Sequence, residues 1–423
     1  MNLEAKLDIL MSLAGDDREG RPGSSTALPP RLRSAAHSGP LRPLNIRNVR
    51  VGANGPKAGL LRILMTNACS FNCHYCPMRR DRELPRTLLK PQEMVRIFLD
   101  ARARGWASGL FITTGIPSRP TKVMDDLLEV LELLRFRHGF GGYIHVKIVP
   151  GADDAQVDRI TALANRVSVN METPCGDTLS TVAPEKRFET TLVALRRAQS
   201  RVSAAREDER AGRPHDALRP GGCAGITTQF VVGATADTDR TIIGKTVELY
   251  QGGGMHHTHF SAFRPVRDTP LENATATPPL REHRLYQADH LIRRYKFSAD
   301  ELVFDGTGNL TLAHDPKVAW AIAHPERFPV ELRSASREEL LRVPGVGPLA
   351  AQRIVAARRT TAIRGLADLR KMGVVTAWAQ GFLSIGGRRL APDRWREQLS
   401  LWAPEEQAGV RPQTFEFSPG TFR

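Results

Sequence analysis

The chain has 423 residues, and its 60 Lys and Arg outnumber its 45 Asp and Glu, which gives a formal net charge of +15. The length predicts two or three domains at roughly 100–200 residues each, and a hydrophobic fraction of 41% excludes a wholly disordered chain. No apolar run approaches the roughly 18–20 residues of a membrane span, and five cysteines in so long a chain argue against a disulfide scaffold.

The N-terminal residues indicate in which cellular compartment the protein lies, and the net charge indicates which partners it binds. Acids at Glu4 and Asp8 and the lack of a long apolar stretch argue against a secretory signal, so we expect a protein of the reducing cytoplasm with no membrane partner. The positive charge makes polyanions the first candidate partners. A generally Arg-rich proteome would produce the same balance.

Residues 1–57 predict a basic N-terminal arm that is partly disordered. Leu3, Leu7 and Leu10 have the spacing of one short amphipathic helix, and a cluster of Gly, Pro and Ser follows it. Residues 31–57 contain six basic residues and no acid.

Residues 58–300 alternate between apolar strand candidates and helical stretches. The predicted strands are Leu60–Met65, Gly109–Thr114, Tyr143–Val149, Arg166–Met171, Ile226–Val232 and His257–Phe263. The predicted helices span residues 91–104, 120–136, 153–164, 186–206, 238–251 and 281–295. This alternation predicts an α/β core with a parallel sheet, a partial (βα)6 barrel, whose chemistry lies at the carboxyl ends of the strands.

The remaining chain predicts three further segments. Residues 301–333 are expected to form a linker, residues 334–390 a separate all-α domain, and residues 391–423 a poorly ordered C-terminal tail.

The strongest motif is Cys69-Ser-Phe-Asn-Cys73-His-Tyr-Cys76, directly after the first predicted strand. Three thiolates on one loop can surround a soft metal centre. A structural zinc site would need four protein ligands, usually in Cys-x2-Cys pairs, and neither the spacing nor the count fits. A cubane iron–sulfur cluster held by three cysteines leaves one iron open.

This spacing, with the aromatic Tyr75 before the last cysteine, resembles the radical S-adenosylmethionine (radical SAM) superfamily. The resemblance implies a 4Fe–4S cluster held by Cys69, Cys73 and Cys76, with SAM bound at the open iron and Tyr75 near its adenine. It further implies that the reduced cluster cleaves SAM to a 5′-deoxyadenosyl radical, with an electron from an external donor such as flavodoxin or ferredoxin.

The other strand ends provide candidate SAM contacts, namely Thr114, Gly115, Asn170, Glu172, Gln229 and Gly233. Thr114 and Gly115 stand where the superfamily usually has Gly-Gly-Glu, but the Glu is absent, and a simple exit from the strand is the alternative. Asn170 and Glu172 alternate and would face the barrel interior. A structural polar network with Lys147 is the alternative.

Five residues stay outside these assignments. Cys175 and Cys223 lack ligand spacing and are expected to be ordinary thiols, and His256, His257 and His259 are expected to be strand-entry residues. The role of all five is left open.

A second motif lies in residues 334–390. Ser336 and Glu339 form a capping box, and Pro344-Gly-Val-Gly347 can turn tightly into another helix. The motif resembles the helix–hairpin–helix, whose amides grip nucleic-acid phosphates without reading bases. The predicted nucleic-acid contacts are Pro344, Gly345, Val346, Gly347, Arg353, Arg358 and Arg359. A weaker second copy follows at residues 365–382, and a purely structural hairpin is the alternative.

Residues 59–390 together resemble radical SAM proteins with a C-terminal helix–hairpin–helix that are described as DNA modification or repair proteins. The N-terminal cysteines of that family pattern are absent here. The resemblance implies a radical SAM enzyme that acts on DNA. An RNA- or tRNA-modifying enzyme, and a non-catalytic DNA-binding iron–sulfur protein, are the alternatives.

Overall fold

We analysed a computed structural model, which describes residues 1–14, 46–50, 57–213 and 225–391. These residues form two compact units. The first unit contains residues 1–14, 46–50, 57–213, 225–237 and 248–278, and the second contains residues 238–247 and 279–391. The division places the last predicted helix of the barrel segment, after residue 278, in the second unit.

The first unit is built on a seven-stranded sheet in the order β1-β2-β3-β4-β5-β6-β7. Its strands are β1 (Ile46–Arg50), β2 (Lys57–Leu64), β3 (Gly109–Thr113), β4 (Tyr143–Lys147), β5 (Arg166–Ser168), β6 (Gly225–Val232) and β7 (Met255–Ala262). Strands β2 to β7 are all parallel, which confirms the predicted sheet of six parallel strands. Their carboxyl ends therefore meet at one edge.

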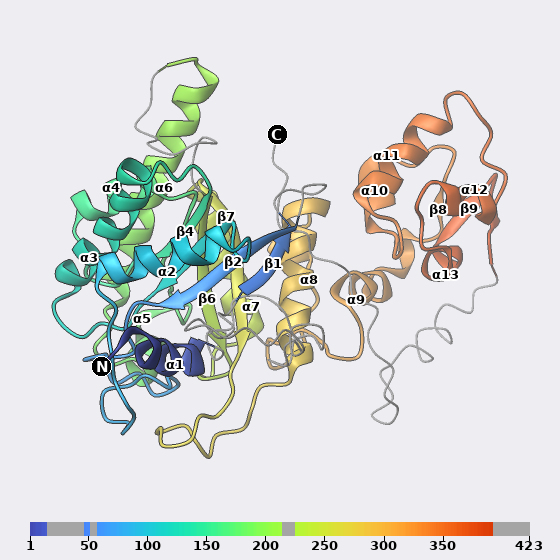
Figure 1. The fold of residues 1–423 in the computed structure, drawn as a ribbon. Helices are drawn as coiled ribbons and strands as arrows, with labels where there is room; N and C mark the ends of the chain where they lie inside the picture. The colour runs from blue at the N-terminus through green and yellow to red at the C-terminus, as the bar shows by residue number, and fades with distance from the viewer. Residues whose placement is uncertain (15–45, 51–56, 214–224, 392–423) are drawn as a thin grey trace, which may run out of the picture. The chain divides into compact units, whose positions relative to one another are not determined.

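Helices connect successive parallel strands. The helices of this part of the chain are α1 (Leu3–Ala14), α2 (Pro91–Ala103), α3 (Pro120–Glu132), α4 (Asp154–Leu163), α5 (Gly176–Val182), α6 (Phe188–Arg210) and α7 (Asp239–Gln251). Helices α2, α3, α4 and α6 pack side by side over one face of the sheet (Figure 1). A π-helical turn, Leu133–Arg137, extends α3. The sheet face beneath these helices is the apolar core, where Leu61, Ile63 and Ile112 are buried.

The N-terminal segment contributes to this unit. The helix predicted from Leu3, Leu7 and Leu10 is present as α1, where Leu7 and Leu10 are buried. β1, which sequence analysis placed in the arm, pairs antiparallel with β2. It forms one edge of the sheet. The rest of the predicted arm lies outside the described residues.

The second unit is mainly helical. Its helices are α8 (Pro279–Tyr295), α9 (Pro316–Ala323), α10 (Arg337–Arg342), α11 (Pro348–Ala357), α12 (Leu366–Lys371) and α13 (Thr376–Ala379), with short 3-10 turns at Ala299–Glu301, Pro325–Arg327 and Gln380–Phe382. Helix α9 lies within the expected linker, and the Asp315 carboxylate caps it by accepting from the amides of Lys317 and Val318. Among the described residues, none of the helices has the length and apolarity that crossing a membrane requires.

The second unit also contains a small sheet, so the prediction of an all-α domain is incomplete. Its strands are β8 (Val330–Glu331), β9 (Leu383–Ile385) and β10 (Arg388–Arg389). Gly386 and Gly387 connect β9 to β10 with φ of 57° and 76°. Two positive φ angles define the two-residue turn that a Gly-Gly pair forms between antiparallel strands, which explains this hairpin.

Candidate functional site

The cysteine loop begins just after β2, at the carboxyl edge of the parallel sheet. The amide and hydroxyl of Ser70 both donate to the carbonyl oxygen of Ile116, at 2.7 and 2.8 Å. A Cβ on Gly115 would lie 2.2 Å from the carbonyl oxygen of Ala68. Gly115 is therefore required for the close approach of the β3 turn to the cysteine loop.

Arg86 fixes the shape of the same loop, and sequence analysis did not single it out. Its guanidinium donates to five backbone carbonyl oxygens at 2.5–3.2 Å, those of Asn67, Met78, Arg79, Arg80 and Arg82. These carbonyls stand before and after the three cysteines. One side chain therefore holds both ends of the loop together.

The three cysteines lie in an apolar setting. Leu179 and Ala183 of the α5 segment pack against buried Cys73, with Phe71, Phe188 and Cys76 around them. The amides of Phe71 and Met78 donate to the sulfurs of Cys69 and Cys76, both at 3.4 Å. Burial raises the pKa of the Cys73 thiol to about 11 and that of Cys76 to about 12. A bound metal centre would favour their thiolate forms instead.

Three soft thiolate donors in apolar surroundings suit an iron–sulfur cluster. No three His, Cys, Asp or Glu side chains within the described parts of the chain converge to hold one metal ion. In a cubane, each cysteine binds a different iron, so the three sulfurs need not converge. The amide donors to sulfur and the apolar surroundings are features that tune such clusters.

A buried ion pair lies beside the cysteines. The Lys186 ammonium donates to Glu172 Oε1 at 2.7 Å and lies 3.4 Å from the hydroxyl of Tyr75. Burial opposes the charge on Lys186, but the Glu172 carboxylate together with Cys73 and Cys76 outweighs it, and the pKa of Lys186 rises above its usual value. Burial and Glu172 also raise the pKa of Tyr75. Sequence analysis proposed Lys147 in a network with Glu172, and it missed Lys186.

The fourth predicted strand ends earlier than expected, at Ser168. The Thr228 hydroxyl donates to the Val169 carbonyl at 2.7 Å and accepts from the Met171 amide at 3.2 Å, which interrupts the ladder. Glu172 then has a φ of 66°, so Asn170 and Glu172 do not alternate along a regular strand. Glu172 still lies beside β6, bridged to Phe230.

Two predicted SAM contacts have buried oxygens that lack partners. Asn170 Oδ1 and Gln229 Oε1 accept no hydrogen bond from other described residues. Buried polar atoms are nearly always paired, so a bound polar ligand would satisfy both. Gly233, with φ of 83°, leaves no room for a Cβ beside the Thr277 hydroxyl, and the Thr114 hydroxyl donates to the Gly115 carbonyl. Of the predicted SAM contacts, Tyr75 packs against the cluster of residues around Cys73, and Glu172, with its partner Lys186, is near enough to affect the pKa of the Cys73 thiol.

Four of the five residues whose role sequence analysis left open lie in the described part of the chain. Cys175 is exposed at the N-terminus of α5, and Cys223 lies outside the described residues. His256, His257 and His259 belong to β7. The ring of His257 contacts the rings of both His256 and His259. They form no metal-binding group with other described side chains.

In the second unit, α10 and α11 are joined by a first hairpin, residues 343–347. The predicted capping box is present, because the Ser336 hydroxyl accepts from the Glu339 amide and the Glu339 carboxylate accepts from the Ser336 amide. Gly345 has φ of 78°, and its carbonyl accepts from the Val375 amide at 2.9 Å. A second hairpin, residues 372–375, thus packs against the first.

Buried Lys317 fixes the orientation of the first hairpin. Its ammonium donates to the carbonyl oxygen of Val346 at 2.6 Å. In a trans peptide the next N–H points the opposite way, so the amide of Gly347 points away from this buried lysine. The amides of Gly345 and Gly347 donate to no other described residue. They are available to an external acceptor.

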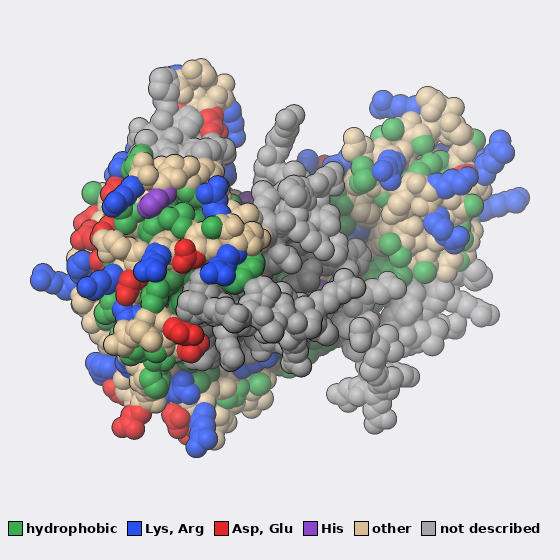
Figure 2. Space-filling view, viewed as in Figure 1, with side chains coloured by type: hydrophobic (Ala, Val, Ile, Leu, Met, Phe, Trp, Pro, Cys, Tyr) green, Lys and Arg blue, Asp and Glu red, His purple; other side chains and the backbone are tan. Residues whose placement is uncertain are grey.

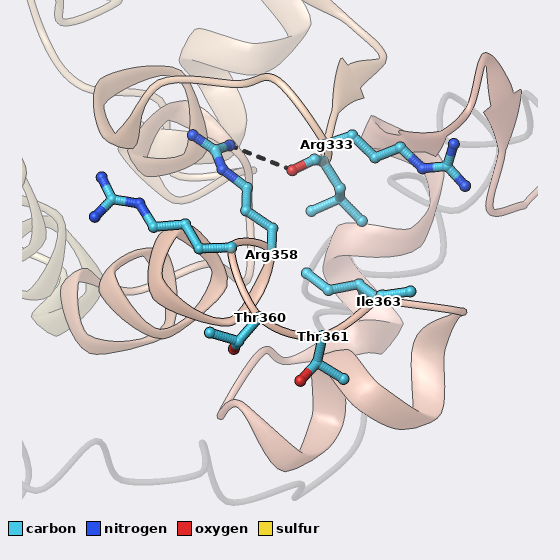
Figure 3. Close-up of a pocket in the computed structure, with 8 residues that line it drawn as sticks. Arg333, Arg358, Thr360, Thr361 and Ile363 are labelled. Carbon is cyan, nitrogen blue, oxygen red and sulfur yellow. Dashed lines mark hydrogen bonds between the residues drawn. The ribbon is translucent and has the colours of Figure 1, made fainter.

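The predicted phosphate-binding arginines differ in their settings. Arg353 and Arg359 are exposed, whereas Arg358 is half-buried and donates to the carbonyls of Leu332 and Ala335. Arg358 therefore has a structural role. A hollow of about 430 Å³ lies beside it, but the guanidinium groups of Arg333 and Arg358 point away from each other (Figure 3), so they do not converge on one ligand.

Comparison with protein families finds a match for the part of the chain that contains the cysteine loop. Residues 63–204, which include the three cysteines, Glu172 and Lys186, match the sequence model of the Radical SAM superfamily. No curated protein matches the chain.

Several solved structures are similar to this chain. One is the FeFe-hydrogenase maturase HydG from Carboxydothermus hydrogenoformans, at 20% identity over 55% of this chain and 51% of that chain, with a TM-score of 0.42. Another is methylornithine synthase (PylB), at 13% identity over 81% of each chain, with a TM-score of 0.41. A third is the radical SAM methyltransferase TsrM from Kitasatospora setae, at 19% identity over 53% of this chain and 41% of that chain, with a TM-score of 0.36. The chain therefore spans about half the length of HydG.

The parallel sheet and its cysteine loop define the class, an α/β fold with a candidate iron–sulfur site at the carboxyl ends of its strands. By this match, residues 63–204 are similar to the Radical SAM superfamily, whose members use a 4Fe–4S cluster and SAM. When bound and reduced, this pair supplies a deoxyadenosyl radical that removes a hydrogen atom from substrate. Radical SAM enzymes in general need an electron donor.

Proposed function

We propose that the chain is a radical SAM enzyme with a 4Fe–4S cluster and SAM as its cofactors, that it acts on DNA in modification or repair, and that its second unit holds the nucleic acid through a helix–hairpin–helix module. The Gly347 amide, which points away from Lys317 in the half-buried turn that contains Gly345, is the observation that carries the proposal. Backbone amides at a helix N-terminus bind phosphate well, and α11 begins directly after Gly347.

The charge of the second unit supports the same partner. Residues 331–390 contain eleven Arg and Lys against four Asp and Glu. The exposed cations are Arg333, Arg337, Arg353, Arg359, Arg364, Arg370, Lys371, Arg388 and Arg389. Lys and Arg side chains outnumber Asp and Glu on the face of this unit that Figure 2 shows. Each phosphate that such a surface neutralises steepens the salt dependence of binding, by about 0.9 in log–log slope on duplex DNA.

In the first unit, we propose that Cys69, Cys73 and Cys76 hold the cluster. We further propose that Tyr75, Thr114, Gly115, Asn170, Glu172, Gln229 and Gly233 surround SAM. The unpartnered oxygens of Asn170 and Gln229 would accept from its polar groups, and Tyr75 would pack near the adenine. The apolar residues around Cys73 would exclude water from the cluster.

The test is anaerobic reconstitution with iron and sulfide, followed by an assay of 5′-deoxyadenosine formation with SAM, a reductant such as flavodoxin or ferredoxin, and DNA, RNA or neither. Stimulation by DNA supports the proposal. If only RNA stimulates 5′-deoxyadenosine formation, the protein is an RNA-modifying enzyme instead. DNA binding without any SAM cleavage would favour a non-catalytic iron–sulfur protein.

Two variants make the test specific. Cys73→Ala should lose the full cluster, and retention of four irons per chain by this variant would contradict the ligand assignment. Arg353→Ala should weaken DNA binding and lower its salt slope, whereas Arg96→Ala, an exposed residue of α2, serves as its control. A cytoplasmic location is part of the proposal.

A further inference from the structure

An exposed apolar surface adjoins the first hairpin. Val375 is 45% exposed and Trp378 is 36% exposed, and both belong to the second hairpin and the α13 segment that follows it. Leu349, in the first turn of α11, is 57% exposed. Large apolar side chains exposed next to one another often mark a binding surface.

The contacts of Gly345 place this surface at the phosphate-binding turn. A Cβ on Gly345 would lie 2.5 Å from the Val375 carbonyl oxygen and 3.2 Å from Trp378 Cβ. Glycine is therefore needed for the backbone of the first hairpin to pack directly against the segment that bears Trp378. The turn that carries the Gly345 and Gly347 amides, which are unpaired within the described residues, therefore packs directly against the Cβ of Trp378 and the backbone next to it.

Cations frame the same surface. Exposed Arg353 donates to the carbonyl of Met372 at 3.3 Å, which brings its guanidinium to the second hairpin. Exposed Arg370 lies 3.5 Å from the Thr376 hydroxyl, and exposed Lys371 is its neighbour in sequence. The surface therefore combines positive charge with an aromatic ring, which is the combination that binds single-stranded nucleic acid.

We propose that the second unit binds unpaired nucleic acid, with an unpaired base stacked on the indole of Trp378 and the adjoining phosphates on the Gly345–Gly347 amides and Arg353. This inference rests on the proposed function and names its substrate class. In a duplex, both faces of each base are already stacked, so only a single-stranded or extruded base offers a free face. The duplex backbone could still contact the amides and arginines.

The experiment measures fluorescence anisotropy of the full chain with a labelled single-stranded oligonucleotide and with its duplex. Trp378→Ala should weaken single-strand binding by about tenfold and leave duplex binding within about twofold. Trp378→Phe, which keeps a ring, should retain most of the affinity. Phe136→Ala removes a 57% exposed aromatic residue of the first unit and is the matched control.

A second measurement detects stacking directly. An oligonucleotide that contains 2-aminopurine should lose fluorescence on binding the wild type, because stacking quenches this base, and should lose less on binding Trp378→Ala. Equal losses of single-strand and duplex affinity in Trp378→Ala, or unchanged quenching, would overturn the inference while the proposed function stands. If the wild type binds neither polymer, the proposed function itself fails.

Discussion

Lys317 donates a hydrogen bond to the Val346 carbonyl at 2.6 Å from a position that is only 8% exposed. Its ammonium also lies 4.6 Å from the centre of the Tyr295 ring. Burial lowers the pKa of Lys317 to about 7, nearby Asp315 opposes this shift, and Arg342 adds to it. The first hairpin is therefore supported by a lysine that titrates near neutral pH.

This relationship predicts a pH-dependent stability. Between pH 7 and about 10 the unfolded chain binds a proton at Lys317 that the folded chain has lost, so the free energy of unfolding rises with pH, by at most about 1.4 kcal/mol per pH unit. Below pH 7, Lys317 is protonated in both the folded and the unfolded chain, so the free energy of unfolding no longer changes with pH through this group. Lys317→Met removes it.

Urea unfolding of the wild type and Lys317→Met across pH 6–9 measures this difference. The stability of the wild type relative to the variant should grow above pH 7. Lys371→Met, at an exposed lysine of the same unit, should show no such trend. Parallel curves for the wild type and Lys317→Met would show that Lys317 titrates near its ordinary pKa.

The ion pair of Lys186 and Glu172 gives a second prediction. The two side chains are 12% and 6% exposed. Lys186→Met leaves a buried carboxylate without its cation, so we expect a loss of about 3–5 kcal/mol of stability. Lys186→Met combined with Glu172→Gln should lose much less, because no buried charge remains.

Thermal unfolding of the cluster-free protein measures both variants. Arg196→Met, which breaks an exposed pair with Glu248, should change stability by less than about 1 kcal/mol. If the double variant is as unstable as Lys186→Met alone, the packing of the lysine chain, rather than the unpaired charge, governs the loss. The pair would then have no electrostatic role.

The parallel sheet was predictable because its strands leave a local pattern. Apolar runs such as Gly109–Thr113 alternate with amphipathic helices, and this alternation alone specifies a parallel sheet. The cysteine loop could be proposed as a metal site for the same reason, since three candidate ligands fall within eight residues. Asp315 before Pro316 is also a local helix-start pattern, and reading it would have located α9.

Lys186 and Arg86 were not predictable from sequence. Lys186 meets Glu172 across 14 residues of loop and helix α5, and no periodicity encodes that contact. Among the described residues, Arg86 binds only backbone carbonyls, which every residue provides, so its role leaves no trace in residue types. The φ of 66° at Glu172 likewise depends on the Thr228 hydroxyl from another strand.

Arg86 gives a third prediction, about the cysteine loop. Arg86→Lys keeps the charge, but one ammonium cannot reach five carbonyls, so we expect a loss of about 2–4 kcal/mol from hydrogen bonds to a charged group. Amide hydrogen exchange in residues 67–82 should accelerate, and iron retained after desalting should fall. Arg96→Lys, on the exposed face of α2, is the control. Unchanged exchange in the loop would mean that the cysteine segment keeps its shape without the Arg86 bonds.

The close approach at Gly115 gives the last prediction. Gly115→Ala places a methyl group 2.2 Å from the Ala68 carbonyl oxygen, a backbone atom that cannot move without shifting the cysteine loop. We expect a loss of about 2–4 kcal/mol of stability and a reduced iron content after reconstitution. Gly244→Ala is the matched control, because Gly244 lies within α7 and a Cβ there meets nothing within 4 Å. That variant should gain up to about 1 kcal/mol from helix propensity. If Gly115→Ala binds a full cluster with wild-type stability, the turn after β3 and the cysteine loop are not packed as tightly as this contact requires.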